Sequence, residues 1–232
     1  MTVTNTSGDT SGDVSRPLSP SELDALSITL RSALVSDILD GMGLREQCLA
    51  PGLVAERTDH TLVGYAYNTR AVVIDEMPAD PYTGLLEALD GIGAGDVYLI
   101  SSSSDAALWG ELTSTAVRSQ GARGAVCDGY LRDVRMVREL GFPAFSRGTS
   151  PRDCAGRVEI SREPGSLAIG GVTVANGDLV VGDEDGVVVI PAHLIEDVVT
   201  AALEKSAAES EFRTAVRQGM KPSEAFERFG VL

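Results

Sequence analysis

Residues 124–133 read GAVCDGYLRD, and this short stretch indicates how the centre of the chain is built. Residues 125–127 are small and apolar, which predicts a short buried strand. The Asp-Gly pair that follows predicts a turn at the end of that strand. Arg132 and Asp133 would then leave the edge of the sheet together. A carboxylate beside a guanidinium could hold a divalent metal and an anionic substrate, but the same two residues could be a surface ion pair.

Segments with helical and strand patterns alternate on both sides of this stretch. Residues 62–74 are rich in Val, Tyr and Thr, which predicts one or two strands with a break near Asn68. Alternation in the middle of the chain, followed by a run of strands and a long helix, predicts a layered α/β or α+β domain. The expected helices are residues 32–42, 82–89, 109–119, 134–140, 195–218 and 223–229, and the other expected strands are residues 97–100, 172–174, 179–181 and 187–190.

The first residues differ in composition from the rest of the chain. Residues 1–19 are dominated by Ser, Thr, Gly and Asp, which predicts a disordered leader or an expression remnant. Residues 20–232 contain no linker and no internal repeat, so we expect them to form one domain. The sequence Ser-Pro-Ser-Glu at residues 19–22 is typical of the start of its first helix.

The composition limits the partners of the protein. The 232 residues include 19 Lys and Arg and 34 Asp and Glu, which gives a formal net charge of −15. An acidic surface repels phosphate groups, so we expect neither nucleic acid nor a membrane as a partner. The three cysteines show no Cys-x-x-Cys spacing, which favours free thiols in a reducing cytoplasm. A small anionic substrate could still bind where a metal and an arginine focus positive potential.

A longer pattern surrounds the Arg-Asp pair. Glu111 is followed by twenty residues and then by Arg132 and Asp133. Together with GFPAFSRGTSP at residues 141–151 and NGDLVVGDEDGVVVIP at residues 176–191, this pattern resembles the RraA-like family, which includes the class II 4-hydroxy-4-methyl-2-oxoglutarate aldolases. The resemblance covers nearly the whole chain beyond the leader. It implies a single α-β-β-α layered domain that assembles into homotrimers, often paired as homohexamers.

The residue types bear on how such an aldolase would work. Cleavage beside a 2-keto acid leaves a pyruvate enolate, whose negative oxygen must be stabilised. A lysine could do this through a Schiff base, but the chain has only Lys205 and Lys221, both in polar C-terminal surroundings. A metal could do it as a Lewis acid. Both histidines lie far from the Arg-Asp pair in the sequence, whereas carboxylate and water ligands suit Mg²⁺ or Mn²⁺.

The resemblance implies a role for each residue of the pattern. Asp133 would bind Mg²⁺ or Mn²⁺, and Arg132 would bind the keto oxygen and stabilise the enolate. Glu111 would position a water for proton transfer. The aldolase pattern commonly has Asp at this position, so the substrate of this chain could differ. Leu112 and Thr113 would bind the substrate carboxylate through the free amides of a helix start.

Several other residues have two interpretations each. Gly110, in the first turn of the helix expected at residues 109–119, is expected to contribute to substrate binding. Asp128 either contacts the residues that bind the metal or only forms the Asp-Gly turn, and the turn is favoured. Residues 183–185 look like a metal cluster, but a solvated hairpin turn is favoured. Glu209 is either a solvated helical carboxylate or, as the resemblance implies, a residue that reaches a neighbouring subunit's site.

The expected function is that of a divalent-metal-dependent lyase acting on a small 2-keto acid. It would perform the retro-aldol cleavage of a 4-hydroxy-2-oxoacid, the decarboxylation of oxaloacetate, or both, because the two reactions share a pyruvate enolate. The alternative is a non-catalytic RraA-like regulator that binds a ribonuclease, since the family includes such inhibitors and strong acidity could mimic RNA. Retention of Glu111, Arg132 and Asp133 favours the lyase.

Overall fold

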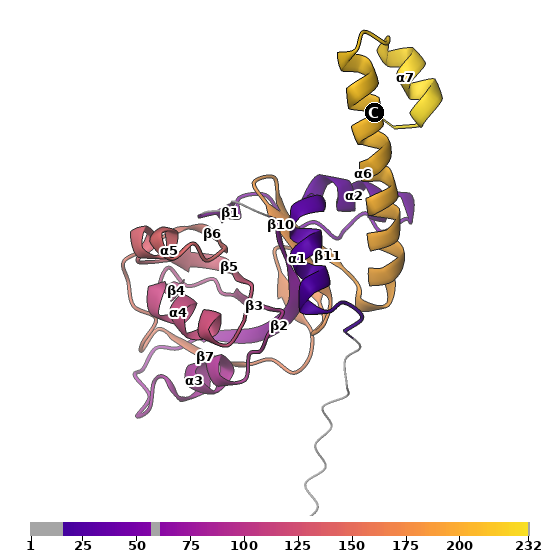
Figure 1. The fold of residues 1–232 in the computed structure, drawn as a ribbon. Helices are drawn as coiled ribbons and strands as arrows, with labels where there is room; N and C mark the ends of the chain where they lie inside the picture. Colours follow the sequence, from indigo (N-terminus) through magenta and orange to yellow (C-terminus); the bar gives the residue numbers. More distant parts are fainter. Residues whose placement is uncertain (1–15, 57–60, 232) are drawn as a thin grey trace, which may run out of the picture.

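The computed structural model describes residues 16–56 and 61–231 (Figure 1). They form a mixed α/β domain with a long C-terminal helix, which confirms the expected fold class. In this described part of the chain, no helix combines the length and the apolar character that crossing a membrane requires.

The expected leader is only partly within the described residues, because residues 1–15 lie outside them. The residues that follow contact the domain. Arg16 Nη2 lies 2.6 Å from Asp96 Oδ1, and the amide of Leu18 donates a hydrogen bond to Tyr65 Oη at 2.7 Å. The division of the chain into a leader and one domain stays a prediction.

A mixed sheet of nine strands forms the centre of the domain. Its strands are β1 (Val54–Ala55), β2 (Leu62–Val73), β3 (Asp96–Ser101), β4 (Ala107–Trp109), β5 (Gly124–Leu131), β6 (Ala144–Thr149), β7 (Val158–Arg162), β10 (Leu179–Asp183) and β11 (Gly186–Ile190). The main path is β1-β6-β5-β3-β2-β10-β11, with β4 paired to β5 and β7 paired to β2. Strands β2, β3, β5 and β6 run parallel to one another, and antiparallel strands flank them. A separate hairpin joins β8 (Leu167–Ile169) and β9 (Val172–Val174).

Strand β2 runs without a break through Asn68, where the sequence suggested one. Up to Asn68 it pairs in parallel with β3, and from Thr69 onward it pairs with β7 instead. The irregular pattern therefore marks a change of partner strand and not the end of a strand.

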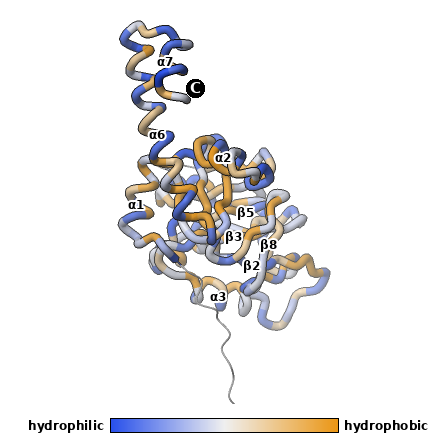
Figure 2. The backbone as a smooth tube through the Cα atoms, turned by 90° about the vertical axis from the view of Figure 1, so that its right-hand side faces the viewer, coloured by the Kyte–Doolittle hydropathy of each residue, from blue (hydrophilic) through white to orange (hydrophobic). Residues whose placement is uncertain are grey.

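The helices cover the sheet in two groups. They are α1 (Pro20–Thr29), α2 (Ser32–Gly41), α3 (Thr83–Asp90), α4 (Glu111–Ser119), α5 (Val134–Leu140), the short 3-10 helix η1 (Ala192–Leu194), α6 (Ile195–Arg217) and α7 (Pro222–Phe229). Helices α3, α4 and α5 lie over the β3, β4 and β5 part, and helices α1, α2 and α6 pack beside β2, β10 and β11 (Figure 1). Figure 2 shows the central strands as the apolar part of the tube and the outer half of α6 with α7 as mainly hydrophilic.

Alternate side chains of the central strands enter different clusters of the core, as the pleat of a strand requires. Tyr98 and Ile100 belong to the cluster beneath α3, α4 and α5. Val97 and Leu99 point to the opposite face, into a cluster that the β8–β9 hairpin completes. Both faces of β3 are therefore covered, which explains its continuous apolar sequence.

The expected turn at Asp128 and Gly129 is wrong. Both residues lie inside β5, which continues to Leu131, and the register between β5 and β6 shifts between Cys127 and Tyr130. A strand can absorb such an irregularity without ending. The sequence patterns also missed β1, β4, β6, β7 and β8.

The turn at residues 183–185 joins β10 and β11 as expected, but its first carboxylate is not solvated. Asp183 is 4% exposed and accepts hydrogen bonds from the amide and the hydroxyl of Ser32 at 2.7 and 2.5 Å. Asp183 therefore anchors the first residue of α2 to the sheet.

Candidate active site

The Arg-Asp pair lies at the junction between β5 and α5. The amide of Arg132 donates to the carbonyl of Trp109 at 2.9 Å, which continues the pairing of β5 with β4. Asp133 then turns the chain into α5 with a left-handed backbone, φ 57° and ψ 31°. It is the one non-glycine residue with positive φ in the described part of the chain, and Asp tolerates this region better than most residues. An unusual backbone conformation at a charged, accessible residue is a common property of functional sites.

The start of α4 lies directly against this junction. A Cβ atom at Gly110 would lie 2.9 Å from Asp133 Oδ2 and 3.1 Å from Arg132 Cγ, so only glycine fits without displacement. The first amides of a helix have no intrahelical partner, which suits them to bind an anion. The hydroxyl of Thr113 accepts from the amide of Gly110 at 3.0 Å and donates to its carbonyl at 2.9 Å, which fixes this turn.

Two carboxylates flank the guanidinium of Arg132. Its Nε lies 3.7 Å from Asp133 Oδ2, and its Nη1 lies 3.4 Å from Asp153 Oδ1. The three side chains are 38%, 41% and 41% exposed, so a small solute can reach them. The hydroxyl of Tyr82 donates to Asp153 Oδ2 at 3.1 Å.

These contacts shift two pKa values. Partial burial acts to raise the pKa of Asp153, but hydrogen bonds from the Ala155 amide and Tyr82, together with Arg132, lower it overall. The hydrogen bond to Asp153 raises the pKa of Tyr82. Asp153 is therefore a stable anion and Tyr82 a stable hydrogen-bond donor at neutral pH.

Two cavities meet at the Arg132–Asp133 pair. The smaller, of about 60 Å³, lies between α3, β4 and the start of α4 and has a mainly apolar wall. The larger, of about 420 Å³, opens on the other side of the pair along residues 131–134 and 149–151. The lining of the smaller cavity comprises Tyr82, Leu85, Ala107, Leu108, Trp109, Gly110, Leu112, Thr113, Arg132, Asp133, Asp153 and Cys154.

The structure brings together five of the residues that the sequence assigned to the site, namely Gly110, Leu112, Thr113, Arg132 and Asp133. Glu111 lines neither cavity. Its Oε1 accepts a hydrogen bond from Thr115 Oγ1, one turn further along α4, at 2.7 Å. The roles proposed for these six side chains and amides stay predictions.

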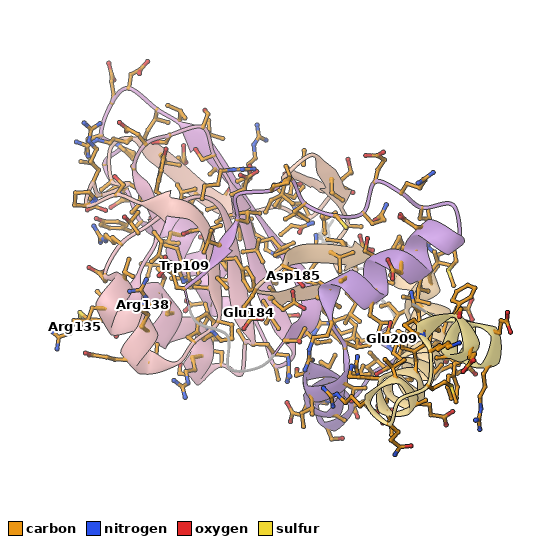
Figure 3. The ribbon with its side chains drawn as sticks, turned by 90° about the horizontal axis from the view of Figure 1, so that it is seen from above. Trp109, Arg135, Arg138, Glu184, Asp185 and Glu209 are labelled. Atoms are coloured by element: carbon orange, nitrogen blue, oxygen red, sulfur yellow. The ribbon has the colours of Figure 1, made fainter. Side chains whose placement is uncertain are left out.

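Asp128 and Glu209 lie outside both cavities. Asp128 pairs with Arg147 of β6 and accepts from the amide of Gly170 at 2.8 Å, so it ties the β8–β9 hairpin to the sheet. Glu209 Oε2 lies 3.9 Å from Arg213 Nη2 on the same helix. Figure 3 places Glu209 at the opposite end of the domain from Trp109, so within one subunit it cannot contact the site.

Sequence reasoning missed Asp153, Tyr82 and Cys154. Asp153 belongs to a second Arg-Asp pair, residues 152–153, and this repetition of the dipeptide was the available signal. Tyr82, the residue before α3, and Cys154, in the segment after β6, reach the cavity through tertiary packing alone, so no local pattern marks them.

A metal at this site would have few protein ligands. Among the residues that the structure describes, no group of three or more His, Cys, Asp or Glu side chains could surround an ion. Asp133 offers an accessible carboxylate, and Mg²⁺ commonly binds through one or two carboxylates while it keeps several waters. The donor set therefore fits a hydrated Mg²⁺ or Mn²⁺ and does not fit a metal whose ligands must all come from the protein.

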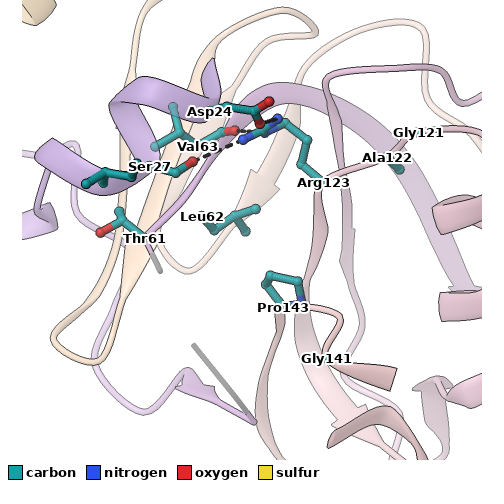
Figure 4. A pocket seen from close by; sticks show the side chains of 11 residues that line it. Asp24, Ser27, Thr61, Leu62, Val63, Gly121, Ala122, Arg123, Gly141 and Pro143 are labelled. Carbon is teal, nitrogen blue, oxygen red and sulfur yellow. Dashed lines mark hydrogen bonds and ion pairs between the residues drawn. The ribbon is translucent and has the colours of Figure 1, made fainter. Parts of the chain in front are cut away.

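A further pocket of about 460 Å³ lies between α1, β2 and the loop before β5 (Figure 4). Its one arginine, Arg123, donates to Asp24 Oδ1 at 2.7 Å and to Ser27 Oγ at 3.0 Å. Arg123 also donates to the carbonyl of Val63. These three hydrogen bonds already engage the guanidinium of Arg123, whereas the carboxylate oxygens nearest to Arg132 lie 3.4 and 3.7 Å away. The N–H groups of Arg132 are therefore more available to an anionic substrate.

Comparison with known proteins extends this picture. The sequence model of the RraA-like family, described as Aldolase/RraA, matches residues 32–189. A protein of Halalkalibacterium halodurans named "Putative 4-hydroxy-4-methyl-2-oxoglutarate aldolase" is 29% identical over 217 residues, which cover 90% of this chain and 96% of that protein. Protein DlpA of Legionella pneumophila is 29% identical over 205 residues, which cover 87% of this chain. The match spans only 33% of DlpA, about a third of its length.

A solved structure agrees with the fold. RraAS2 of Streptomyces coelicolor, described as an unusual member of the RNase ES inhibitor RraA protein family, has a TM-score of 0.72 and 28% identity to this chain. The similarity covers 82% of this chain and 94% of RraAS2.

Proposed function

Because the chain belongs to the RraA-like family, we propose that it is a divalent-metal-dependent lyase that cleaves a small 2-keto acid to release pyruvate. The observation that carries the proposal is the convergence of Arg132, Asp133 and the start of α4 on one small cavity. The similarity to the aldolase-named relative over 96% of its length supports the same reaction class.

The substrate would be oriented by the chain's own groups. Its carboxylate would bind the free amides of Leu112 and Thr113, where the helix start favours negative charge. Arg132 would donate to the keto oxygen, on which negative charge develops as the bond breaks. An electrostatic donor of this kind stabilises a transition state by roughly 3 kcal/mol.

Asp133 would hold Mg²⁺ or Mn²⁺, which supplies Lewis-acid polarisation of the substrate when bound. In the retro-aldol reaction the C3–C4 bond breaks, its electron pair enters the enolate, and the C4 hydroxyl loses a proton. A water positioned by Glu111 would accept that proton, and protonation of the enolate at C3 would then give pyruvate. In the decarboxylation of oxaloacetate the same enolate forms with loss of CO₂, so one site serves both reactions.

The assembly is also a proposal. A homotrimer or a pair of trimers would bring further residues to the site, and Glu209 of a neighbouring subunit is the candidate. Light scattering of the full chain tests the assembly, and a monomer in solution would contradict it.

The function itself is tested by pyruvate release from oxaloacetate and from 4-hydroxy-4-methyl-2-oxoglutarate with Mg²⁺. The variant Asp133→Asn is the control for the spontaneous reaction. If the protein releases no pyruvate from either compound beyond the spontaneous rate, the proposal is wrong.

The similarity to RraAS2 supports a second candidate, a regulator that binds a ribonuclease. The net charge of −15 suits a protein that competes with RNA for a basic surface. Co-purification with a ribonuclease, without any metal-dependent pyruvate release, would favour the regulator over the lyase.

A further inference from the structure

Arg132 stands between two carboxylates, and it forms a close contact with neither. The separations are 3.7 Å from Nε to Asp133 Oδ2 and 3.4 Å from Nη1 to Asp153 Oδ1. A relaxed arginine–carboxylate pair closes to about 2.8 Å. The guanidinium is therefore shared between the two anions and is not committed to the one beside it in the sequence.

The two carboxylates are held very differently. Asp153 Oδ2 accepts from the hydroxyl of Tyr82 at 3.1 Å, and Oδ1 accepts from the amide of Ala155 at 3.4 Å. Its backbone forms a parallel bridge with Ala107 of β4, beside the cavity. Asp133, by contrast, makes no side-chain capping hydrogen bond at the start of α5. Hydrogen bonds therefore hold the carboxylate of Asp153 in place, whereas the carboxylate of Asp133 lacks a capping hydrogen bond.

The shared position has a consequence for Asp133. Two opposite charges a few ångströms apart attract strongly at a partly exposed site. Without Asp153, nothing described on that side would hold the guanidinium, and Arg132 would close onto Asp133. That closed pair would occupy the carboxylate oxygen that a cation needs and the N–H groups that a keto oxygen needs.

We propose that Asp153, held by Tyr82, is a positioning residue that keeps Arg132 from closing onto Asp133, so that both stay available to ligands. Its effect on catalysis rests on the proposed lyase function. Its effect on the position of Arg132 and on cation binding does not depend on turnover.

Three variants of the full chain test the inference. Asp153→Asn removes the charge and keeps the shape, and Tyr82→Phe removes only the hydroxyl. The matched control is Asp105→Asn, because Asp105 also pairs with an arginine, Arg152, but lines neither cavity. The measurements are the Arg132–Asp133 separation in crystal structures, Mn²⁺ binding by electron paramagnetic resonance, and the separate values of kcat and KM.

In Asp153→Asn we expect the Nε–Oδ2 separation to fall from 3.7 Å to about 2.8 Å and Mn²⁺ affinity to fall roughly tenfold. Misplacement of a catalytic group by about 1 Å lowers kcat by roughly 10²-fold, and KM should change less. Tyr82→Phe should shift the same quantities in the same direction by a smaller factor, and Asp105→Asn should change none of them.

The outcomes separate the two ideas. An unchanged position of Arg132 and unchanged Mn²⁺ affinity in Asp153→Asn would overturn the inference, whether or not the wild type is a lyase. A wild-type protein without turnover would remove the lyase proposal, while the position of Arg132 in the variant would still decide the inference. An equal loss in Asp105→Asn would also overturn it, because the effect would then be general charge loss.

Discussion

Gly110 lies so close to Asp133 that a methyl group on Gly110 would stand 2.9 Å from Asp133 Oδ2. The two residues belong to different elements, the start of α4 and the start of α5, and both pack at the end of the β4–β5 pair. The close approach sets the candidate ligand oxygen directly beside the N-cap residue of α4.

Gly110→Ala should therefore lower activity by roughly 10- to 100-fold, because the new methyl group must push Asp133 or Arg132 from its place. Stability should fall only slightly, since both displaced side chains are partly exposed. Steady-state kinetics together with urea unfolding check this. Gly41→Ala is the control, because nothing lies within 4 Å of a Cβ there. Equal activity of the two variants would contradict the account of the site.

Arg132→Lys keeps the positive charge but loses the planar fork that can bind two oxygens. We expect kcat to fall roughly 10²-fold, the loss seen when one donor to a developing oxyanion is removed. Stopped-flow detection of pyruvate measures it. Arg135→Lys, on the exposed face of α5, should retain wild-type kcat, and a variant at residue 132 with full activity would argue against its contact with the substrate.

Asp133→Asn should weaken the binding of Mn²⁺ by at least about tenfold, because a neutral amide is a poorer ligand for a hard cation than a carboxylate. Isothermal titration of the purified protein measures this without substrate. Asn also tolerates the left-handed backbone at residue 133, so the fold should remain intact. Unaltered Mn²⁺ affinity would place the metal elsewhere.

Asp183→Ala should lower the free energy of unfolding by about 2–3 kcal/mol, because it leaves the buried amide and hydroxyl of Ser32 without their charged acceptor. Urea titration should give a lower midpoint with an unchanged slope. Glu184→Ala, at the exposed next residue, should be near neutral. Equal stability of the two variants would show that the contact with α2 contributes little.

Much of the fold follows from local sequence. The helix over residues 134–140 and the strand over residues 172–174 have the predicted bounds, because apolar periodicity and glycine stops are local signals. The helix expected at residues 109–119 begins at Glu111 instead. Trp109 belongs to β4, whose three residues pair with β5 and carry too short a pattern to be recognised.

The site was predictable where its residues are neighbours in the sequence or where the family pattern fixes their spacing, as it does between residues 110–113 and the Arg132–Asp133 pair. Arg132 and Asp133 adjoin one another, so one local pattern contains both. The Asp-Gly pair before them suggested a turn, whereas the structure has a register shift within β5. That shift depends on the pairing of β5 with β6, which the local sequence does not show. Asp153 contacts Arg132, and Tyr82 contacts Asp153, from segments twenty or more residues away in the sequence. Such contacts depend on tertiary packing, which no local pattern encodes.

The most direct test of the central claim is the Mg²⁺-dependent release of pyruvate from 4-hydroxy-4-methyl-2-oxoglutarate and from oxaloacetate, measured before and after chelation by EDTA. The account predicts turnover by the wild type with at least one of the two compounds, loss of turnover with EDTA, recovery on addition of Mg²⁺, and only the background rate for Asp133→Asn. Turnover that survives chelation, or a wild type no faster than Asp133→Asn, would contradict it.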